Sequence, residues 1–120
     1  MAEHNETGQK GEDIAAEYLK NKGYSILETN YRFGNLEADI IATMDKIVIV
    51  AEVKTRKNNT FGEPETFVTK QKQKNLVKAA NNYMIRYKID MEVRFDIVSV
   101  IMNSSGTTVN HIEAAFYPML

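Results

Sequence analysis

One stretch of the chain decides the fold: residues 47–54, Ile-Val-Ile-Val-Ala-Glu-Val-Lys. Its leading residues are apolar and mostly β-branched, which is typical of a strand buried on both faces of a sheet. Because side chains alternate along a strand, Glu52 and Lys54 point to one face and Val53 points to the other. The sequence therefore predicts a carboxylate and an amine side by side at the end of a buried strand.

A second segment, residues 37–41 with the sequence Glu-Ala-Asp-Ile-Ile, puts two more carboxylates on one face of another strand. Charged groups at the mouth of a buried sheet are costly unless they are paired or bind a cation. In metal-assisted phosphodiester hydrolysis, carboxylates hold Mg²⁺, the ion lowers the pKa of a bound water, and a lysine stabilises the developing negative charge. Asp39, Glu52 and Lys54 match these roles, with the Val53 carbonyl as a further metal ligand. The alternative is a cross-strand salt bridge, because short motifs often match by chance.

The length and composition of the chain suit one domain. We expect a single domain over residues 1–120, with its core at about residues 7–117. The chain has no cysteine, which excludes disulfides and zinc–thiolate sites. No apolar stretch approaches the roughly 20 residues of a membrane span, and the polar, acidic N-terminus does not match a signal peptide. We therefore expect a cytoplasmic protein without a membrane partner.

The net charge of −1 does not by itself indicate nucleic-acid binding, because such proteins usually carry a basic surface. The basic residues are nevertheless clustered, at Lys54, Arg56 and Lys57 after the buried strand and again between residues 70 and 78. A small nuclease can be neutral overall because its acidic metal ligands offset its phosphate-binding surface. We expect nucleic acid as the partner, with Arg56, Lys57 and Lys72 as its contacts.

Turn residues and apolar periodicity divide the chain into helices and strands. A helix is expected over residues 12–22, because glycines at 8 and 11 precede it and Gly23 ends it. The other expected elements are strands at 24–30, 37–43 and 46–54, a helix at 69–88, and strands at 92–102 and 108–112, joined by turns at 31–35, 44–45 and 103–106 and by a loop at 55–67. This α-β-β-β-α-β-β order predicts an α/β fold in which helices flank a mixed β-sheet.

Glu12 lies on the side of the first helix that must face the sheet, with Ala15, Ala16 and Leu19. A carboxylate in this position would reach toward the charged end of the strands. The alternative is that Glu12 only benefits from the helix dipole, which favours an acid in the first turn.

Lys72 stands at the N-terminal end of the apolar stripe of the second long helix. The expected members of this stripe are Leu76, Ala79, Ala80, Tyr83 and Tyr87. A lysine in this position could contact phosphate together with the helix N-terminus, or its stem could cover apolar surface while the amine stays in water. Three other lysines, Lys70, Lys74 and Lys78, occupy a different face and are expected to be solvated.

Two other kinds of polar residue have simpler interpretations. Asp96, in an otherwise apolar strand, is expected to be a buried structural ion-pair partner, with a metal role as the alternative. His4 and His111 have no second ligand at a metal-binding spacing, so we expect both to be incidental.

A set of residues along the chain allows comparison with a known family. It comprises Gly11-Glu12, Ala16, Tyr18-Leu19, Gly23-Tyr24, Asn30, Arg32, Glu37-x-Asp39, Glu52-Val53-Lys54-Thr55-Arg56, Phe61-Gly62, Pro64, Val68, Lys72-Gln73, Arg94-Phe95-Asp96 and Ala115-Phe116. In this set the chain resembles the YraN-like family of small bacterial proteins, over almost its whole length. That family is assigned to the PD-(D/E)XK, or restriction-endonuclease-like, superfamily and is similar to archaeal Holliday-junction resolvases.

The resemblance implies an active-site set of Glu12, Asp39, Glu52 and Lys54, with Lys72 as an accessory. It implies an endonuclease that cuts DNA with Mg²⁺, or with Mn²⁺ in its place, on branched or recombination-intermediate substrates and as a homodimer. The alternatives are a non-catalytic nucleic-acid-binding module on the same fold and an RNA-processing nuclease. The chain departs from the family where the family usually has Gly-Glu-Ile-Asp, because residues 36–39 here are Leu-Glu-Ala-Asp.

Overall fold

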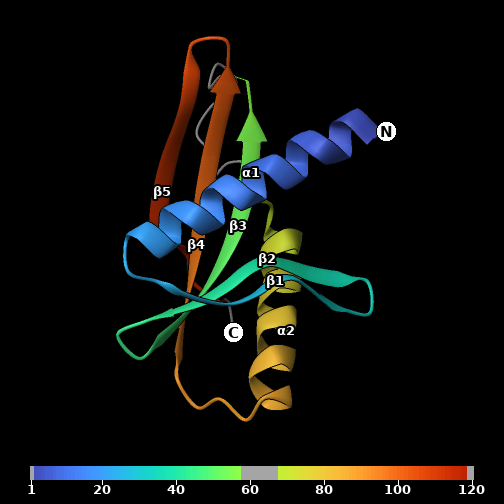
Figure 1. Cartoon of the computed structure of the whole chain (residues 1–120). Helices are drawn as coiled ribbons and strands as arrows, with labels where there is room; N and C mark the ends of the chain where they lie inside the picture. Colours follow the sequence, from blue (N-terminus) through green and yellow to red (C-terminus); the bar gives the residue numbers. More distant parts are fainter. Residues whose placement is uncertain (1, 58–67, 119–120) are drawn as a thin grey trace.

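The computed structural model describes residues 2–57 and 68–118. It contains two helices and five strands, shown in Figure 1: α1 (Ala2–Asn21), β1 (Ser25–Phe33), β2 (Leu36–Met44), β3 (Ile47–Arg56), α2 (Lys70–Arg86), β4 (Glu92–Asn103) and β5 (Gly106–Phe116). The order of the elements is the one that the sequence predicts, and the fold is mixed α/β. No helix in the described ranges is long and apolar enough to cross a membrane.

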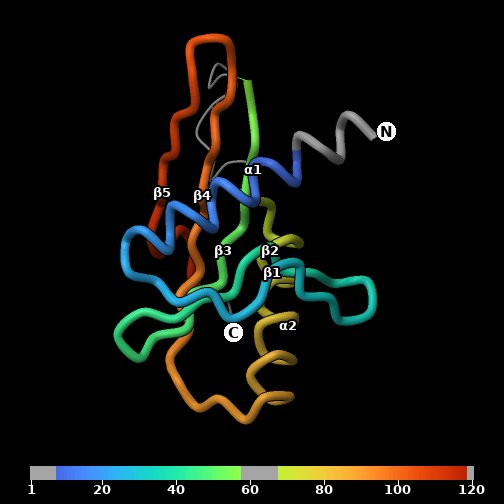
Figure 2. The backbone as a smooth tube through the Cα atoms, viewed as in Figure 1, coloured from blue at the N-terminus to red at the C-terminus, as the bar shows by residue number. Residues whose placement is uncertain are grey.

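The strands form one sheet in the order β1-β2-β3-β4-β5. Tight connections join β1 to β2, β2 to β3 and β4 to β5, and these pairs are antiparallel (Figure 2). The chain passes through α2 between β3 and β4, which are therefore parallel, because parallel neighbours need a long crossover. The strand β3 thus lies in the middle of the sheet.

The two helices cover opposite faces of this sheet. Ala15 and Leu19 of α1 pack on Ile49 and on the other residues of one apolar cluster. Leu76 and Ala79 of α2 belong to a second cluster on the other face. Residues 48–51 of β3 are almost completely buried between the clusters, as their composition predicts. The residues that follow them in β3, 52–56, are half-buried.

The first helix begins earlier than expected, at Ala2 and not at Glu12. The glycines at 8 and 11 were expected to precede the helix, but they lie within it. A Cβ on Gly11 would stand 2.0 Å from Oγ1 of Thr55 in β3. The glycine is explained by this close approach of helix and strand. The helix end agrees with the prediction, because Gly23 has a φ of +96° and follows the last turn.

The two turns that flank β2 also differ from the prediction. The expected turn at 31–35 is shorter, because β1 continues to Phe33 and only residues 34 and 35 turn. Tyr31 is buried and packs edge-on against Tyr83, with ring centroids 5.0 Å apart. The next turn is at Asp45 and Lys46, one residue later than expected. Both have positive φ, 49° and 67°, as a tight hairpin turn requires.

The later elements show further differences from the sequence-based boundaries. The strand β3 includes residues 55 and 56, which were expected in a loop, while residues 58–67 of that loop, with Phe61-Gly62 and Pro64, lie outside the described residues. The strand β5 continues beyond residue 112 because a register shift lets it pair again at Phe116. The helix α2 ends at Arg86, so Tyr87 is 49% exposed, and Met84 is buried where Tyr87 was expected.

Candidate active site at the end of strands β2 and β3

The candidate site begins where β2 and β3 stop pairing. Their paired residues end at Ile40 and Ala51. The next residue of β2, Asp39, accepts a hydrogen bond through Oδ2 from the N–H of Val53, at 2.8 Å. A carboxylate thus takes the place of the missing main-chain partner, and only 8% of Asp39 is exposed. Because the N–H and C=O of a strand residue point to the same side, the Val53 carbonyl faces the same gap.

Glu52 lies next to Asp39, and its pKa shift is the largest among the acids that the structure describes. Burial raises the pKa of Glu52 to about 8, together with hydrogen bonding to Asp39 and repulsion from its charge. The positive charges of Lys54 and Lys72 lower this pKa only in part. Two carboxyl groups therefore share one partly buried space that has too little positive charge for both to ionise freely.

Glu12 approaches the same pair from α1. Its pKa is raised by burial, and then by the charge of Asp39. A hydrogen bond with the Asn30 side chain acts in the opposite direction. Asn30 has a positive φ of 53°, a conformation that asparagine tolerates better than most residues. The structure thus brings Glu12 to Asp39, as expected, and adds Asn30, which motif spacing alone did not single out.

Lys54 and Lys72 complete this group, which we call the Glu52 centre: Glu12, Asp39, Glu52, Lys54 and Lys72. Burial lowers the pKa of Lys54, and the nearby amine of Lys72 lowers it further. Among the described residues, no ion pair within 4.0 Å joins Lys54 to Asp39 or to Glu52. This finding argues against the alternative of a simple cross-strand salt bridge.

A hollow of about 170 Å³ opens beside Glu52. It lies between the β1–β2 turn and the first turns of α2, and its lining residues are Asn35, Leu36, Glu37, Glu52, Lys72 and Asn75. Asn35, Glu37 and Asn75 were not expected here. Asn75 follows Lys72 at a spacing of three, which puts both on neighbouring positions of the helix surface. Its side-chain oxygen accepts a hydrogen bond from Gln71 at 3.0 Å, so its amide nitrogen can donate into the hollow.

The other expected nucleic-acid contacts lie at the end of β3. Arg56 is two residues beyond Lys54 in the same strand and so shares its face. Lys57 is exposed just after the strand, and its carbonyl accepts a hydrogen bond from Asn103 at 2.8 Å. Neither residue lines the hollow beside Glu52.

The residues present fit a small divalent cation. Asp39 and Glu52 supply two carboxylates and Val53 a carbonyl, and Mg²⁺ needs few protein ligands because it keeps several waters. The excess of carboxyl groups over cations at this point is the physical reason for the fit. In the part of the chain that the structure describes, no three acids or histidines are grouped as ligands. Glu12 adds a further carboxyl next to Asp39.

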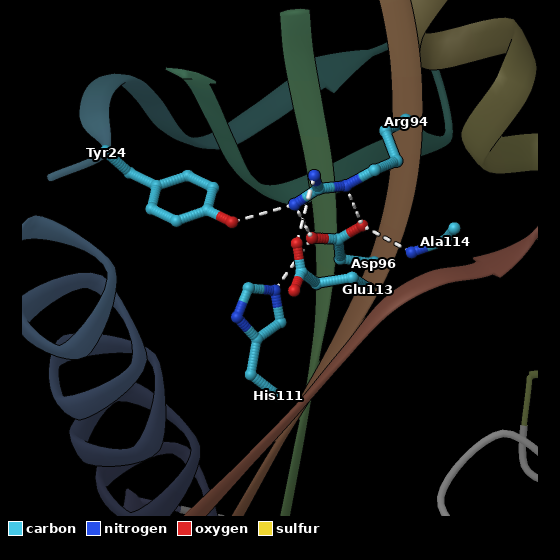
Figure 3. A network of polar contacts seen from close by, with 6 residues as sticks. All are labelled: Tyr24, Arg94, Asp96, His111, Glu113 and Ala114. Carbon is cyan, nitrogen blue, oxygen red and sulfur yellow. Dashed lines mark hydrogen bonds and ion pairs between the residues drawn. The ribbon is translucent and has the colours of Figure 1, made fainter. Parts of the chain in front are cut away.

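A second buried carboxylate, Asp96 of β4, has a very different environment, shown in Figure 3. Both of its oxygens accept hydrogen bonds from Arg94, at 2.8 and 2.7 Å. His111 Nε2 lies 2.7 Å from Oδ2, and the N–H of Ala114 donates to Oδ1 at 2.9 Å. The expectation of a buried ion-pair partner is confirmed. The expectation that His111 is incidental is wrong, because its side chain is buried and hydrogen-bonded to Asp96. The side chain of His4 is outside the part of the chain that the structure describes.

Arg94 links this group to two further side chains. It donates to the hydroxyl of Tyr24 at 2.8 Å and pairs with Glu113 at 3.1 Å. We call these residues the Asp96 network: Tyr24, Arg94, Asp96, His111, Glu113 and Ala114. Burial alone would raise the pKa of Asp96, but the hydrogen bonds from His111, Arg94 and Ala114 outweigh it and lower the pKa.

The structure defines a mixed α/β protein whose central strands end in a partly buried group of carboxyls and amines. The model of the uncharacterised protein family UPF0102 matches residues 11–100. A UPF0102 protein of Christiangramia forsetii is 51% identical over 117 residues, 98% of each chain. Another, from Bacteroides thetaiotaomicron, is 46% identical over 120 residues, 100% of this chain and 99% of its own. The chain therefore belongs to the UPF0102 family, which confirms the resemblance to YraN-like proteins at the level of the family.

Proposed function

We propose that the chain is a Mg²⁺-dependent endonuclease with a restriction-endonuclease-like, or PD-(D/E)XK, core that hydrolyses phosphodiester bonds in DNA. The observation that carries the proposal is the charge balance of the Glu52 centre. Asp39 and Glu52 lie close enough for burial and mutual repulsion to hold the pKa of Glu52 at about 8. A divalent cation between them would stabilise both in the ionised form.

Each residue of the Glu52 centre has a role in this proposal. Asp39, Glu52 and the Val53 carbonyl would hold the ion. The bound Mg²⁺ would polarise the phosphate and lower the pKa of a bound water. Lys54 would orient the attacking water and stabilise negative charge on the phosphate. Its lowered pKa lets the amine release a proton more readily than an exposed lysine.

Glu12 and Lys72 act on this set from the two helices. Glu12 restrains Asp39 electrostatically from α1. Lys72 lies in the first turn of α2, where its N–H bonds to Oγ1 of Thr69 at 3.2 Å, and its amine faces the hollow beside Glu52. A phosphate in the hollow would meet Lys72 and the amide of Asn75. The hollow supports a site that takes the substrate backbone from the α2 side.

The order α-β-β-β-α-β agrees with a restriction-endonuclease-like core, and the resemblance to Holliday-junction resolvases supports branched DNA as the substrate. Arg56, Lys57 and Lys72 would contact its phosphates. A homodimer would place two Glu52 centres about a two-fold axis, which suits a symmetric branched substrate.

Direct cleavage assays test this function. Purified protein is incubated with linear, single-stranded, flapped and four-way DNA and with RNA, each with Mg²⁺, Mn²⁺ or EDTA. We expect metal-dependent cleavage of DNA, strongest on branched forms, that is lost in Asp39→Asn and in Glu52→Gln. Lys54→Ala should lose cleavage but retain Mn²⁺ binding and most DNA affinity, because it removes a contact made mainly in the transition state.

Three results would contradict the proposal. Cleavage that survives in both acid variants would exclude the Glu52 centre. Binding without cleavage on every substrate would indicate a non-catalytic nucleic-acid-binding module. Cleavage of RNA alone would indicate an RNA-processing nuclease.

A further inference from the structure

The helix α2 has an unusual charge for a chain of net charge −1. Its sequence, KQKQKNLVKAANNYMIR, contains four lysines and an arginine and no acidic residue. Solvated helix surfaces usually intersperse the two signs, because pairs three or four residues apart stabilise the helix. Among the described residues, no lysine of α2 takes part in an ion pair. The positive charge of this helix is therefore available to an anionic partner.

Three of these lysines form a single row. Lys70, Lys74 and Lys78 are four residues apart and all exposed. With a rise of about 1.5 Å per residue, their positions follow one another along the helix at intervals of about 6 Å. Lys72 lies on the other side of the helix, facing the hollow beside Glu52. The row is therefore separate from the Glu52 centre.

A cavity of about 410 Å³ lies along this row and distinguishes it from an ordinary solvated surface. Its lining residues are Lys70, Gln73, Lys74, Val77, Lys78, Tyr117 and Pro118. The base is partly apolar, through Val77 and Pro118, and no acid among the described residues lines it. Tyr117, just after β5, is 74% exposed, so its ring is open to a ligand. We call this cavity the α2 outer groove.

We propose that the α2 outer groove binds an unpaired nucleic-acid strand, with one base stacked on Tyr117 and the adjacent phosphates on Lys74 and Lys78. A basic groove with an exposed aromatic ring is the combination that single-strand binding uses, because lysines follow the backbone while the ring accepts any base. A duplex has its bases stacked inside and offers none to Tyr117. The groove is independent of the cleavage proposal, since it needs neither the metal nor Lys54.

The test measures binding in EDTA, where cleavage does not contribute. Fluorescence anisotropy of a short labelled oligothymidylate is recorded for the full chain. Tyr117→Ala should weaken binding by roughly 5-fold to 150-fold, the range for one stacked base, while Tyr117→Phe, which keeps the ring, should stay close to the parent. A 2-aminopurine in the oligonucleotide should be quenched by the parent and by Tyr117→Phe but not by Tyr117→Ala.

The lysines are tested by the salt dependence of the same binding. Lys74→Gln with Lys78→Gln should reduce the slope of log affinity against log salt by roughly 1.4, or about 0.7 for each single-strand phosphate contact. The matched control is Lys20→Gln with Lys88→Gln, two exposed lysines away from the groove, and it should change the slope little.

Several outcomes would overturn the proposal. An equal loss in the control pair would indicate general attraction of polyanions. Full affinity in Tyr117→Ala would exclude stacking. Equal competition by polyglutamate would indicate an acidic protein segment, and equal competition by thymidine monophosphate at the same nucleotide concentration would indicate a mononucleotide site.

Discussion

The sheet carries two buried carboxylate centres that differ in how their charge is balanced. In the Asp96 network, a guanidinium, an imidazole and a backbone N–H surround one carboxylate, and the pKa of Asp96 is lowered. In the Glu52 centre, burial and a second carboxyl raise the pKa of Glu52 to about 8. Lys54 is near but makes no close ion pair in the described part of the chain.

This difference separates a structural acid from a candidate functional acid. A buried charge that has all its partners stabilises a fixed arrangement and leaves no position for a ligand. A buried pair of like charges is costly in the absence of a ligand, and such a group can be retained because it binds something. The comparison therefore predicts opposite responses of the two centres to substitution, to pH and to divalent ions.

The largest expected effect is on stability. Asp96→Asn should lower the free energy of unfolding by about 3 kcal/mol, because Arg94 loses the buried carboxylate with which it forms an ion pair. Glu52→Gln should be neutral or stabilising at pH 8, because it removes a charge that burial disfavours. Urea unfolding of both variants checks the difference, and equal losses would contradict the distinction between the two centres.

The second prediction concerns pH. The folded pKa of Glu52 is about 8, well above its usual value of 4.5, so the folded state binds the proton more tightly than the unfolded state. Without divalent ions, stability should therefore fall as pH rises from about 4.5 to about 8, by about 2–3 kcal/mol after allowance for solvent relaxation. Glu52→Gln should flatten this dependence in thermal unfolding followed across pH.

The Asp96 network should respond in the opposite direction. Because the pKa of Asp96 is lowered from 3.8, its stabilising contribution is present above that value and is lost as pH falls through the folded pKa. Below about pH 4, the free energy of unfolding should therefore depend less on pH in Asp96→Asn than in the parent protein. The same pH dependence in both proteins would contradict this assignment.

The third prediction uses a divalent ion to separate the centres. At a hundred times its dissociation constant, Mn²⁺ should stabilise the parent protein by about 2.7 kcal/mol. Asp39→Asn should abolish this gain, because a metal ligand loses its charge while the amide oxygen can still accept from Val53. The matched control is Asp90→Asn, which changes an exposed acid and should retain the stabilisation by Mn²⁺. Calorimetric titration gives the affinities, and unchanged binding in Asp39→Asn would exclude the proposed ion site.

The smallest expected effect concerns the contact that places Glu12 near the Glu52 centre. Gly11→Ala puts a Cβ 2.0 Å from Thr55 Oγ1, so the Thr55 side chain or the helix must shift. The expected cost is about 1–3 kcal/mol, as for other overpacked sites. Thr55→Ala removes that hydroxyl and should recover part of the loss in the double variant. If the single variant is as stable as the parent, the close approach does not constrain α1.

Much of the fold, and those relations of the Glu52 centre that lie within one helix or strand, could be predicted from local periodicity, while the family resemblance implied the set as a whole. Alternation along β3 gives the shared face of Glu52 and Lys54, and helical spacing places Glu12 on the sheet side of α1. These relations hold within a single element, so the sequence contains them directly. The element order followed from the same patterns.

The remaining features depend on contacts between distant parts of the chain. His111 has no local feature that marks it, and its role arises only when β5 pairs beside β4. The same holds for Gly11, which meets Thr55 across two elements, and for Asn30, which meets Glu12. A glycine in a sequence can mean a helix boundary or a close contact, and only the packing distinguishes them.

The Val53 amide offers a spectroscopic probe of the Glu52 centre within the backbone itself. The Val53 N–H donates a hydrogen bond to Asp39 Oδ2. The chemical shift of this amide in an isotope-labelled sample therefore depends on the electron density of that carboxylate. A cation that reaches Asp39, or the titration of the neighbouring Glu52, changes that density and should shift the signal, without any label at the surface. The Ala114 amide, which donates to Asp96 at 2.9 Å, is an internal reference of the same chemical kind. The Val53 signal should shift when divalent ions are added and when the pH passes through about 8, while the Ala114 signal should not.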